Sequence, residues 1–228
     1  MEPKEILKKY WGWDAFRPGQ EEAIQSGIAG RDTLVILPTG GGKSLCYQLV
    51  GLHQEKMTLV ISPLVALMMD QVKSLKDKGF NALSISGSLK EQELVEVLDH
   101  CQYGGLDFLF VSPERLQNPL VRERLQSLTI ALLVVDEAHC ISQWGHDFRP
   151  AYRKIHEVFP LINHPTIMAL TATATPKVQE DIMDTLQLRD PNTVQTSFDR
   201  PNLCYKVMQT DNKLGALSEL LQKSEGNA

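Results

Sequence analysis

Short apolar runs alternate with longer amphipathic stretches along most of this chain of 228 residues, and this alternation limits the possible folds more than any other feature. Several of the runs consist almost entirely of Val, Ile and Leu, as expected for parallel strands that are covered on both faces. The pattern therefore predicts an α/β fold with a mostly parallel sheet and helices on both faces. The predicted strands are Thr33–Leu37, Met57–Ile61, Ala82–Ile85, Asp107–Val111, Ile130–Val135 and Thr166–Leu170.

The amphipathic stretches predict the helices that connect and cover these strands. After a turn-rich break at residues 197–202, we expect a short strand at Leu203–Val207 and a helix at Lys213–Lys223, which together are too short for a domain. The other predicted helices are Glu2–Tyr10 and Gly19–Gly30 before the first strand, and then Ser44–Leu52, Leu64–Lys78, Lys90–Cys101, Leu120–Leu125, Tyr152–Val158 and Lys177–Leu186.

The composition excludes several classes of protein. With 23 Lys and Arg against 28 Asp and Glu, the net charge is −5, so nucleic acid would be bound through local groups and not through a global positive field. The sequence has no run of eighteen apolar residues and no signal peptide, which argues against a membrane protein. The four cysteines lie far apart, which fits reduced thiols in a cytoplasmic, or nucleoid-associated, intracellular protein.

A glycine-rich segment follows the first predicted strand and leads directly into a helix. Such a loop turns successive backbone N–H groups towards an anion, and the helix N-terminus adds its partial positive charge. The strict phosphate-loop pattern would need Gly where this chain has Leu37, so the match is to the shorter GxGKS form. The alternative is a glycine turn with an exposed lysine. The predicted phosphate-binding residues are Thr39, Gly40, Gly41, Gly42, Lys43, which would reach the β- and γ-phosphates, and Ser44, which would ligate Mg²⁺.

Two carboxylates end the buried strand Ile130–Val135, where packing explains them poorly. Asp136 suits a Mg²⁺ ion held by Ser44, and Glu137 suits the base or positioner of an attacking water. Adjacent residues on a strand point to opposite faces, so the two carboxylates can take separate roles. The alternative is a solvated strand end. Together with the phosphate loop, the pair predicts nucleoside triphosphate hydrolysis with Lys43, Asp136 and Glu137 as the catalytic residues.

At this point the chain resembles the RecQ family of DNA helicases, within helicase superfamily two, and the resemblance covers nearly its whole length. It consists of seven motifs in the family's order, which makes a chance match implausible. They are Trp13–Gln20 (motif 0), Pro38–Gln48 (I), Ser62–Gln71 (Ia), Val111–Leu116 (Ib), Asp136–Arg149 (II with an aromatic-rich loop), Leu170–Ala174 (III) and Ser197–Asn202, the junction to a second lobe.

The resemblance implies an adenine-binding segment near the N-terminus. In motif 0 the family stacks an aromatic side chain on the base and reads the base edge with Gln, which points to Trp13 and Gln20, supported by Arg17. Gln offers both a donor and an acceptor to adenine. The family usually has Phe-Gly-Tyr where this chain has Trp11-Gly-Trp13. The alternative for Trp13 is a core aromatic that caps a helix.

The resemblance also implies a DNA-binding surface. The family's aromatic-rich loop senses single-stranded DNA by stacking, and aromatic and Arg side chains bind bases without sequence preference. Motifs Ia and Ib would contact DNA phosphates, although plain strand-end turns explain their Ser-Pro pairs equally well. The implied DNA-binding residues are Ser62, Ser112 and Arg115, with Trp144, His146, Phe148 and Arg149 from the loop.

The predicted function is the ATP-binding motor lobe of a RecQ-type 3′-to-5′ DNA helicase, with ATP and Mg²⁺ as cofactors and DNA and a second motor lobe as partners. Residues 1–202 would form the first RecA-like P-loop NTPase lobe, with adenine recognition at 10–20, and residues 203–228 a linker and the truncated start of the second lobe. Because no motif of the second lobe follows, we expect this chain to bind nucleotide, to hydrolyse it slowly and to unwind nothing. The alternatives are a non-catalytic regulatory module that binds nucleotide or single-stranded DNA and, less favoured, a small-molecule P-loop kinase.

Overall fold

The computed structural model describes residues 1–87, 89–103, 105–145, 147–197, 203 and 207–223. The chain divides into two units, Met1–Ser197 and Phe198–Ala228, and each is described by itself. None of the helices in these described stretches is long and apolar enough to cross a membrane.

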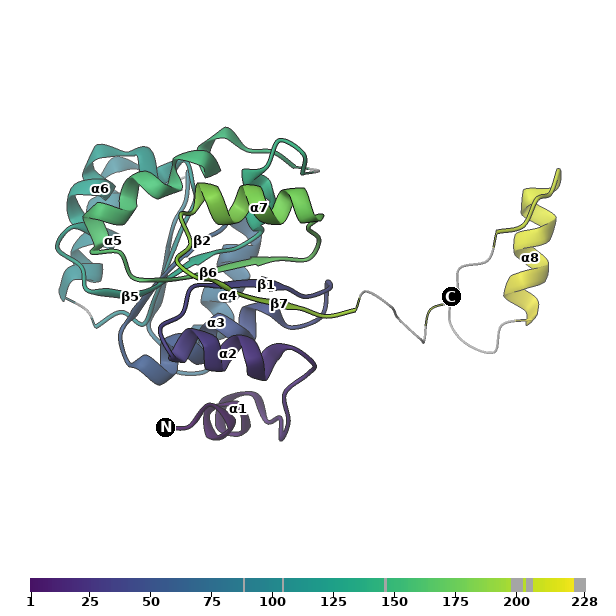
Figure 1. The fold of residues 1–228 in the computed structure, drawn as a ribbon, viewed down its shortest axis with the longest axis horizontal. Helices are drawn as coiled ribbons and strands as arrows, with labels where there is room; N and C mark the ends of the chain where they lie inside the picture. Colours follow the sequence, from purple (N-terminus) through teal and green to yellow (C-terminus); the bar gives the residue numbers. More distant parts are fainter. Residues whose placement is uncertain (88, 104, 146, 198–202, 204–206, 224–228) are drawn as a thin grey trace. The chain divides into compact units, whose positions relative to one another are not determined.

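The first unit is built on a sheet of seven parallel strands in the order β3-β4-β2-β5-β6-β1-β7. Figure 1 shows this sheet with helices on both sides of it. The predicted fold class and all six predicted strands of the sheet are confirmed. The seventh strand was missed, because only Val194 in it is buried and its pattern is weak. The strands are β1 (Thr33–Ile36), β2 (Met57–Ile61), β3 (Ala82–Ile85), β4 (Phe108–Val111), β5 (Ile130–Val135), β6 (Thr166–Thr171) and β7 (Asn192–Gln195).

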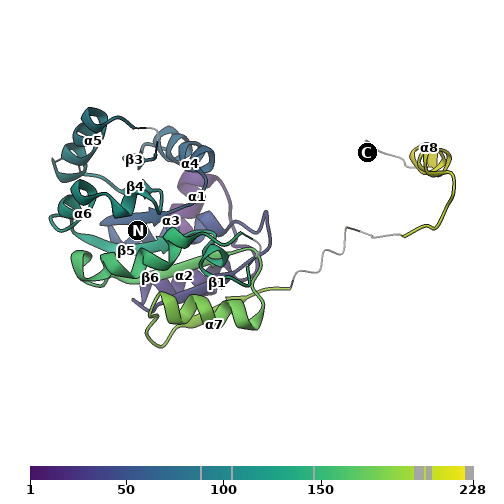
Figure 2. The same ribbon diagram turned by 90° about the horizontal axis from the view of Figure 1, so that it is seen from above.

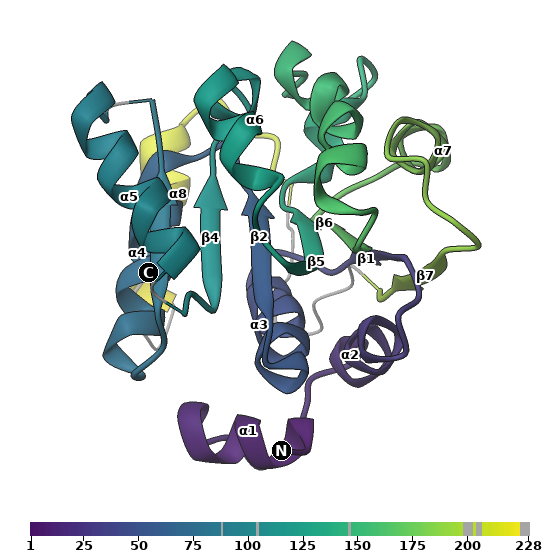
Figure 3. The same cartoon turned by 90° about the vertical axis from the view of Figure 1, so that its left-hand side faces the viewer.

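Helices cover both faces of this sheet, as Figures 2 and 3 show from two directions. On one face, α2, α3 and α4 pack on the sheet, and α1 packs against α3. The helices are α1 (Pro3–Trp11), α2 (Gln20–Ile28), α3 (Lys43–Gln54) and α4 (Val65–Asp77) on this face, then α5 (Glu91–Tyr103), α6 (Pro119–Leu125), the 3₁₀ segment η3 (Pro150–Ile162) and α7 (Pro176–Thr185) on the other, with short 3₁₀ turns η1 (Arg115–Gln117) and η2 (Ala138–Ile141).

The alternation of side chains along β1 shows how the sequence builds two cores from one strand. Leu34 and Ile36 belong to the core beneath α5, α6 and α7, whereas Val35 and Leu37 belong to the core beneath α2 and α3. All four are at most 1% exposed, and burying each such side chain contributes about 1.5–3 kcal/mol. This two-sided burial is why the strands read as continuous apolar runs.

The second unit contains α8 (Lys213–Lys223), which confirms the helix predicted there. The strand predicted at Leu203–Val207 falls largely on residues outside the described part of the chain. Within α8, Leu214, Leu217, Leu220 and Leu221 are all exposed.

Candidate nucleotide site at the carboxyl edge of the sheet

Three segments with polar side chains meet where neighbouring strands end. The glycine loop follows β1, Asp136 follows β5, and Thr171 ends β6, which lies between these two strands. Backbone hydrogen bonds continue past the strand ends, from Leu37 N to Thr171 O (3.2 Å) and from Asp136 N to Ile61 O (2.8 Å). The sheet therefore holds all three segments at its carboxyl edge, where open α/β sheets bind their ligands.

The glycine loop has the backbone conformation that its sequence predicts. Gly40 and Gly42 have φ of 78° and 79°, in the left-handed region that favours glycine. A Cβ on Gly41 would lie 2.8 Å from Pro38 O, so this position also requires glycine. Gly42 is the N-cap of α3 and has no side chain to cap the helix. The first N–H groups of α3 are thus positioned for an anion.

Lys43 and Ser44 stand in the first turn of α3, at the mouth of a pocket. The Lys43 ammonium donates to Leu37 O at 3.3 Å, so it is already folded back over the loop. The pocket is lined by the glycine loop, the acidic pair, the ends of β2 and β4, and α4. The lining residues are Gly40, Gly42, Lys43, Ser44, Ser62, Leu67, Met68, Gln71, Phe110, Asp136 and Glu137.

Asp136 carries the larger electrostatic penalty of the acidic pair. Its burial, and then the nearby Glu137 carboxylate, raise its pKa from 3.8 to about 6, although Glu137 N donates to its Oδ1 at 3.0 Å. A buried carboxylate with too few donors is stabilised by a cation, and a hard ion such as Mg²⁺ prefers oxygen ligands. The donor set of Asp136 and the Ser44 hydroxyl therefore fits Mg²⁺. Among the described residues no group of three or more His, Cys, Asp or Glu side chains suits a metal, so phosphate and water would complete the ligands.

Glu137 is held in a different state from its neighbour. Its backbone has φ of 48°, a left-handed conformation that is strained for a residue with a side chain. Its Oε2 lies 3.3 Å from His139 Nδ1, and this contact lowers the pKa of Glu137. The carboxylate is therefore ionised at neutral pH and can accept a proton from water or orient one.

His139 was not among the predicted site residues, yet it joins two of the three segments. Its Nδ1 lies 2.9 Å from Thr171 Oγ1, whose hydroxyl donates to Thr173 O at 3.1 Å. The Thr171 oxygen is thus an acceptor towards the histidine. The contacts of His139 with the Cys140 sulfur and with Glu137 raise its pKa, which favours the protonated ring. The sequence signal was the position of His139 three residues after Asp136.

The predicted adenine segment lies beside the glycine loop. Trp13 is 43% exposed, and the Arg17 guanidinium carbon lies 5.5 Å from the centre of its ring. Arg17 also donates to Gly40 O. Gln20 is buried: its Nε2 donates to Gly41 O at 3.0 Å, and its Oε1 accepts from Arg17 N at 2.9 Å. The Gln20 amide therefore supports the loop, and its contact with a base stays a prediction.

The predicted phosphate contacts from motifs Ia and Ib lie in internal positions. Ser62 and Ser112 are each 3% exposed, and Ser62 lines the nucleotide pocket. The Arg115 guanidinium donates to three carbonyls of the loop after β3, at 2.9, 3.1 and 2.7 Å. In this structure Arg115 therefore holds a loop. The three accepting carbonyls belong to Ser86, Gly87 and Leu89.

The aromatic-rich loop follows η2, and residues near its two ends, Trp144 and Arg149, contact other parts of the first unit. Trp144 is 67% exposed, and Lys177 Nζ of α7 lies 3.6 Å from its ring centre. Arg149 donates to Pro63 O at 3.0 Å, next to the start of α4. Phe148 is half-buried, and His146 lies outside the described residues. The loop thus presents one large aromatic face to solvent at the same edge as the pocket.

Comparison with known proteins places these features in a family. The family model described as DEAD/DEAH box helicase matches residues 17–182. The chain is 46% identical over 225 residues to the ATP-dependent DNA helicase RecQ of Bacillus subtilis, covering 98% of this chain and 38% of the relative. It is 42% identical over 212 residues to the ATP-dependent helicase wrn-1 of Caenorhabditis elegans, covering 91% and 20%. The chain therefore spans less than half the length of these curated relatives.

Solved structures agree with this assignment at the level of the fold. The helicase domain of Hef from Pyrococcus furiosus superimposes with a TM-score of 0.63 at 19% identity, over 89% of this chain and 40% of that one. The DUF1998 helicase MrfA bound to DNA gives a TM-score of 0.69 at 19% identity, over 86% and 29%. The family model, the sequence relatives and the fold agree, and the chain belongs to the DEAD/DEAH box helicase family.

Proposed function

We propose that this chain is the ATP-binding motor lobe of a RecQ-type 3′-to-5′ DNA helicase, with residues 1–202 as its first RecA-like lobe. The observation that carries the proposal is the meeting of the glycine loop, Asp136 and Glu137 at one edge of the sheet, around one pocket. The similarity to RecQ helicases over 98% of the chain supports the choice among helicase types.

In this proposal, different residues at the site bind the phosphates, the base, Mg²⁺ and the attacking water. Backbone N–H groups at residues 40–44 and the Lys43 ammonium would hold the β- and γ-phosphates, and Trp13 would stack on the base. Ser44 and Asp136 would hold Mg²⁺, which neutralises phosphate charge. Glu137 would orient the attacking water and accept its proton, since its pKa is lowered and it is ionised at neutral pH.

His139 links Glu137 to the end of strand β6. Its Nδ1 lies 3.3 Å from Glu137 Oε2 and 2.9 Å from Thr171 Oγ1, so one ring nitrogen faces both side chains. Loss of the γ-phosphate would change the charge that Glu137 experiences, and the change would reach the end of β6 through the histidine. We therefore assign Thr171, in the segment Leu170–Ala174, a part in coupling the nucleotide state to motion.

The DNA partner would be bound through the aromatic-rich loop. The exposed ring of Trp144 offers a stacking face for a base, with Phe148, His146 and Arg149 in the same loop. Ser62 and Ser112 are buried, and Arg115 is bonded to the loop after β3. These residues would therefore contact DNA phosphates only if the turns around them changed conformation. With a net charge of −5, we expect weak and strongly salt-dependent DNA binding.

Residues 203–228 would be a linker and the start of a second motor lobe. This part of the chain belongs to a separate unit, and the leucines of α8 are exposed. In the complete motor the second lobe would supply an arginine to the γ-phosphate, which raises the rate by a factor on the order of 10³–10⁵. Without it, this chain would bind ATP and hydrolyse it slowly.

Steady-state hydrolysis and calorimetric binding of Mg·ATP, with and without single-stranded DNA, test the proposal. Glu137→Gln should keep the affinity and abolish turnover, whereas Lys43→Ala should abolish binding. The Glu137→Gln protein is also the blank for slow turnover. If Glu137→Gln bound ATP no better than Lys43→Ala, the roles assigned to the two residues would be wrong. Binding without any turnover above the blank, even with a second lobe added, would favour a regulatory module.

A further inference from the structure

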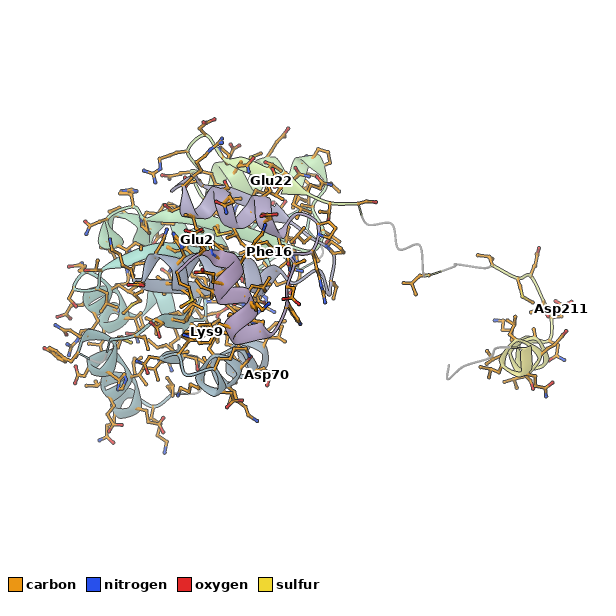
Figure 4. The ribbon with its side chains drawn as sticks, turned by 90° about the horizontal axis from the view of Figure 1, so that it is seen from below. Glu2, Lys9, Phe16, Glu22, Asp70 and Asp211 are labelled. Atoms are coloured by element: carbon orange, nitrogen blue, oxygen red, sulfur yellow. The ribbon has the colours of Figure 1, made fainter. Side chains whose placement is uncertain are left out.

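Helix α1 precedes the adenine segment, and none of the roles assigned above uses it. It has nine residues, and an isolated helix of this length is marginal in water. Its position depends on packing: Ile6 and Leu7 are at most 2% exposed. In Figure 4 α1 crosses the face of the molecule between the labelled Glu2 and Lys9, with Phe16 in the segment that follows.

Aromatic contacts hold the carboxyl end of α1 against the turn that follows α4. The rings of Tyr10 and Phe80 lie 4.6 Å apart at 56°, and Tyr10 also meets the Trp11 ring edge-on at 6.5 Å. Lys78 Nζ lies 5.6 Å from the centre of the Trp11 ring. Such aromatic pairs stabilise the packing beyond the area that they bury. We call Tyr10, Trp11, Lys78 and Phe80 the aromatic anchor.

Only one residue separates the aromatic anchor from Trp13. Gly12 ends α1 in the left-handed conformation, with φ of 71°, and its N–H donates to Lys8 O. Trp13 then lies over Arg17, which donates to Gly40 O of the phosphate loop. Residues 13–17 are therefore held at two points, the aromatic anchor before them and the phosphate loop after them.

We propose that the aromatic anchor positions Trp13 for the base, so that Phe80 and Tyr10 set the preference of the pocket for ATP over a bare triphosphate. The proposal rests on the stacking role of Trp13 in the proposed function. A stacking side chain that the fold has already ordered loses less entropy when the base binds. Without the anchor, only the Arg17 end would restrain the segment, and Trp13 would have to be ordered by the nucleotide.

Phosphate binding should not depend on the anchor. Its groups lie at the N-terminus of α3, which is bonded there to Gln20 and packs against α2, β5 and β6 as well as against α1. Loss of the anchor should therefore change affinity for ATP and leave affinity for inorganic tripolyphosphate nearly unchanged. A general loosening of the fold would weaken both ligands together.

The test is calorimetric titration with Mg·ATP and with Mg·tripolyphosphate, on four single variants and one double variant. We expect Phe80→Ala to weaken ATP binding about 10-fold and tripolyphosphate binding less than about 2-fold. Tyr10→Phe keeps the ring and should bind both ligands like the parent. Tyr103→Ala, which removes an aromatic ring that is 79% exposed on α5, is the matched control and should change neither.

The fourth single variant, Trp13→Ala, and the double variant with Phe80→Ala separate the anchor from the base-stacking role. If Phe80 acts through Trp13, the double variant should bind ATP no more weakly than Trp13→Ala alone. Full additivity, or equal weakening of both ligands in Phe80→Ala, would overturn the proposal and leave the proposed function standing. If Trp13→Ala itself left the ATP-to-tripolyphosphate ratio unchanged, the stacking role would fail and the anchor proposal with it.

Discussion

Two aspartates lie at opposite edges of the same sheet, Asp32 buried and Asp136 partly buried, and their carboxylates have different hydrogen-bond partners. Asp32 precedes β1 at the amino edge and is 2% exposed; it accepts hydrogen bonds from Ile167 N at 2.9 Å and Arg189 N at 2.8 Å. Asp136 follows β5 at the carboxyl edge and receives one backbone N–H, from the residue next to it. Burial raises the pKa of Asp136 to about 6.

The difference separates a carboxylate that holds the fold together from one that, in the proposed function, would bind Mg²⁺. The donors to Asp32 come from the start of β6 and from the segment before β7, so its side chain joins the neighbours of β1. Its backbone carbonyl also accepts from Asn192 N at 2.9 Å. Asp136 accepts from a single backbone N–H, so its carboxylate has oxygen lone pairs available to a Mg²⁺ ion. We therefore expect the Asp136 carboxylate to lower the free energy of unfolding of the protein without a bound cation.

The largest effect on folding should come from Asp32→Ala. The substitution leaves the buried N–H of Ile167 and the partly buried N–H of Arg189 without their acceptor, and each such group costs up to about 1–3 kcal/mol. We expect the free energy of unfolding to fall by about 3 kcal/mol, measured by urea denaturation. Mg·ATP affinity of the folded protein should be unchanged, because the nucleotide pocket lies at the other edge. A loss below about 1 kcal/mol would contradict the role of Asp32 in joining the strands.

Asp136→Asn should change stability in the other direction. A rise in pKa from 3.8 to about 6 means that folding disfavours the ionised form, by about 1–3 kcal/mol at neutral pH. The neutral amide avoids this penalty, so the nucleotide-free variant should unfold at higher urea concentration than the parent. Its affinity for Mg·ATP should fall. A variant that is less stable than the parent at pH 7 would show that the carboxylate is not under strain.

The pH dependence of that difference provides a finer test. Because the folded-state pKa of Asp136 is the higher one, the folded protein holds this proton more tightly than the unfolded chain. Its contribution to stability is complete below about pH 4 and is lost as the pH rises through about 6. The stability gap between Asp136→Asn and the parent should therefore open between pH 4 and 6. Urea midpoints at each pH measure it, and a constant gap would assign the effect to packing.

The smallest effect on stability should come from removing the partner of an exposed carboxylate. Glu21 pairs with Lys4 at 2.7 Å, but the two side chains are 54% and 63% exposed. Exposed pairs contribute about 0.2–1 kcal/mol, so Lys4→Ala should lower the free energy of unfolding by about 0.5 kcal/mol or less. The change should shrink in high salt. An effect as large as that of Asp32→Ala would remove the contrast between buried and exposed carboxylates.

Local patterns predicted most of the fold and the centre of the site. The apolar runs predicted six of the seven strands, because strands buried on both faces need continuous apolar side chains. The exception, β7, has a single buried side chain and therefore little pattern to detect. The glycines of the loop were predictable because their backbone conformation is required locally, whatever surrounds them.

Contacts between distant residues were not predictable in this way. Arg115 has the sequence signature of a phosphate-binding residue, yet its guanidinium binds the loop after β3, because β4 and β3 are neighbours in the sheet. The Gln20 amide likewise takes partners inside the protein, since its Nε2 donates to Gly41 O of the glycine loop and its Oε1 accepts from Arg17 N. A side chain with several hydrogen-bonding groups takes whichever partners the fold brings near, and the chain order does not state which those are.

The sequence by itself determined the α/β class, the positions of the strands, the glycine loop and the acidic pair, since each depends on residues close together in the chain. Only the tertiary structure decided that Asp32 accepts from two N–H groups distant in the chain and Asp136 from its neighbour Glu137, that His139 reaches Thr171, and that the aromatic anchor stands beside Trp13. The physical reason is that burial and hydrogen-bond partners come from strand order and helix packing, which join residues as far as 160 positions apart, as Asn192 N and Asp32 O are.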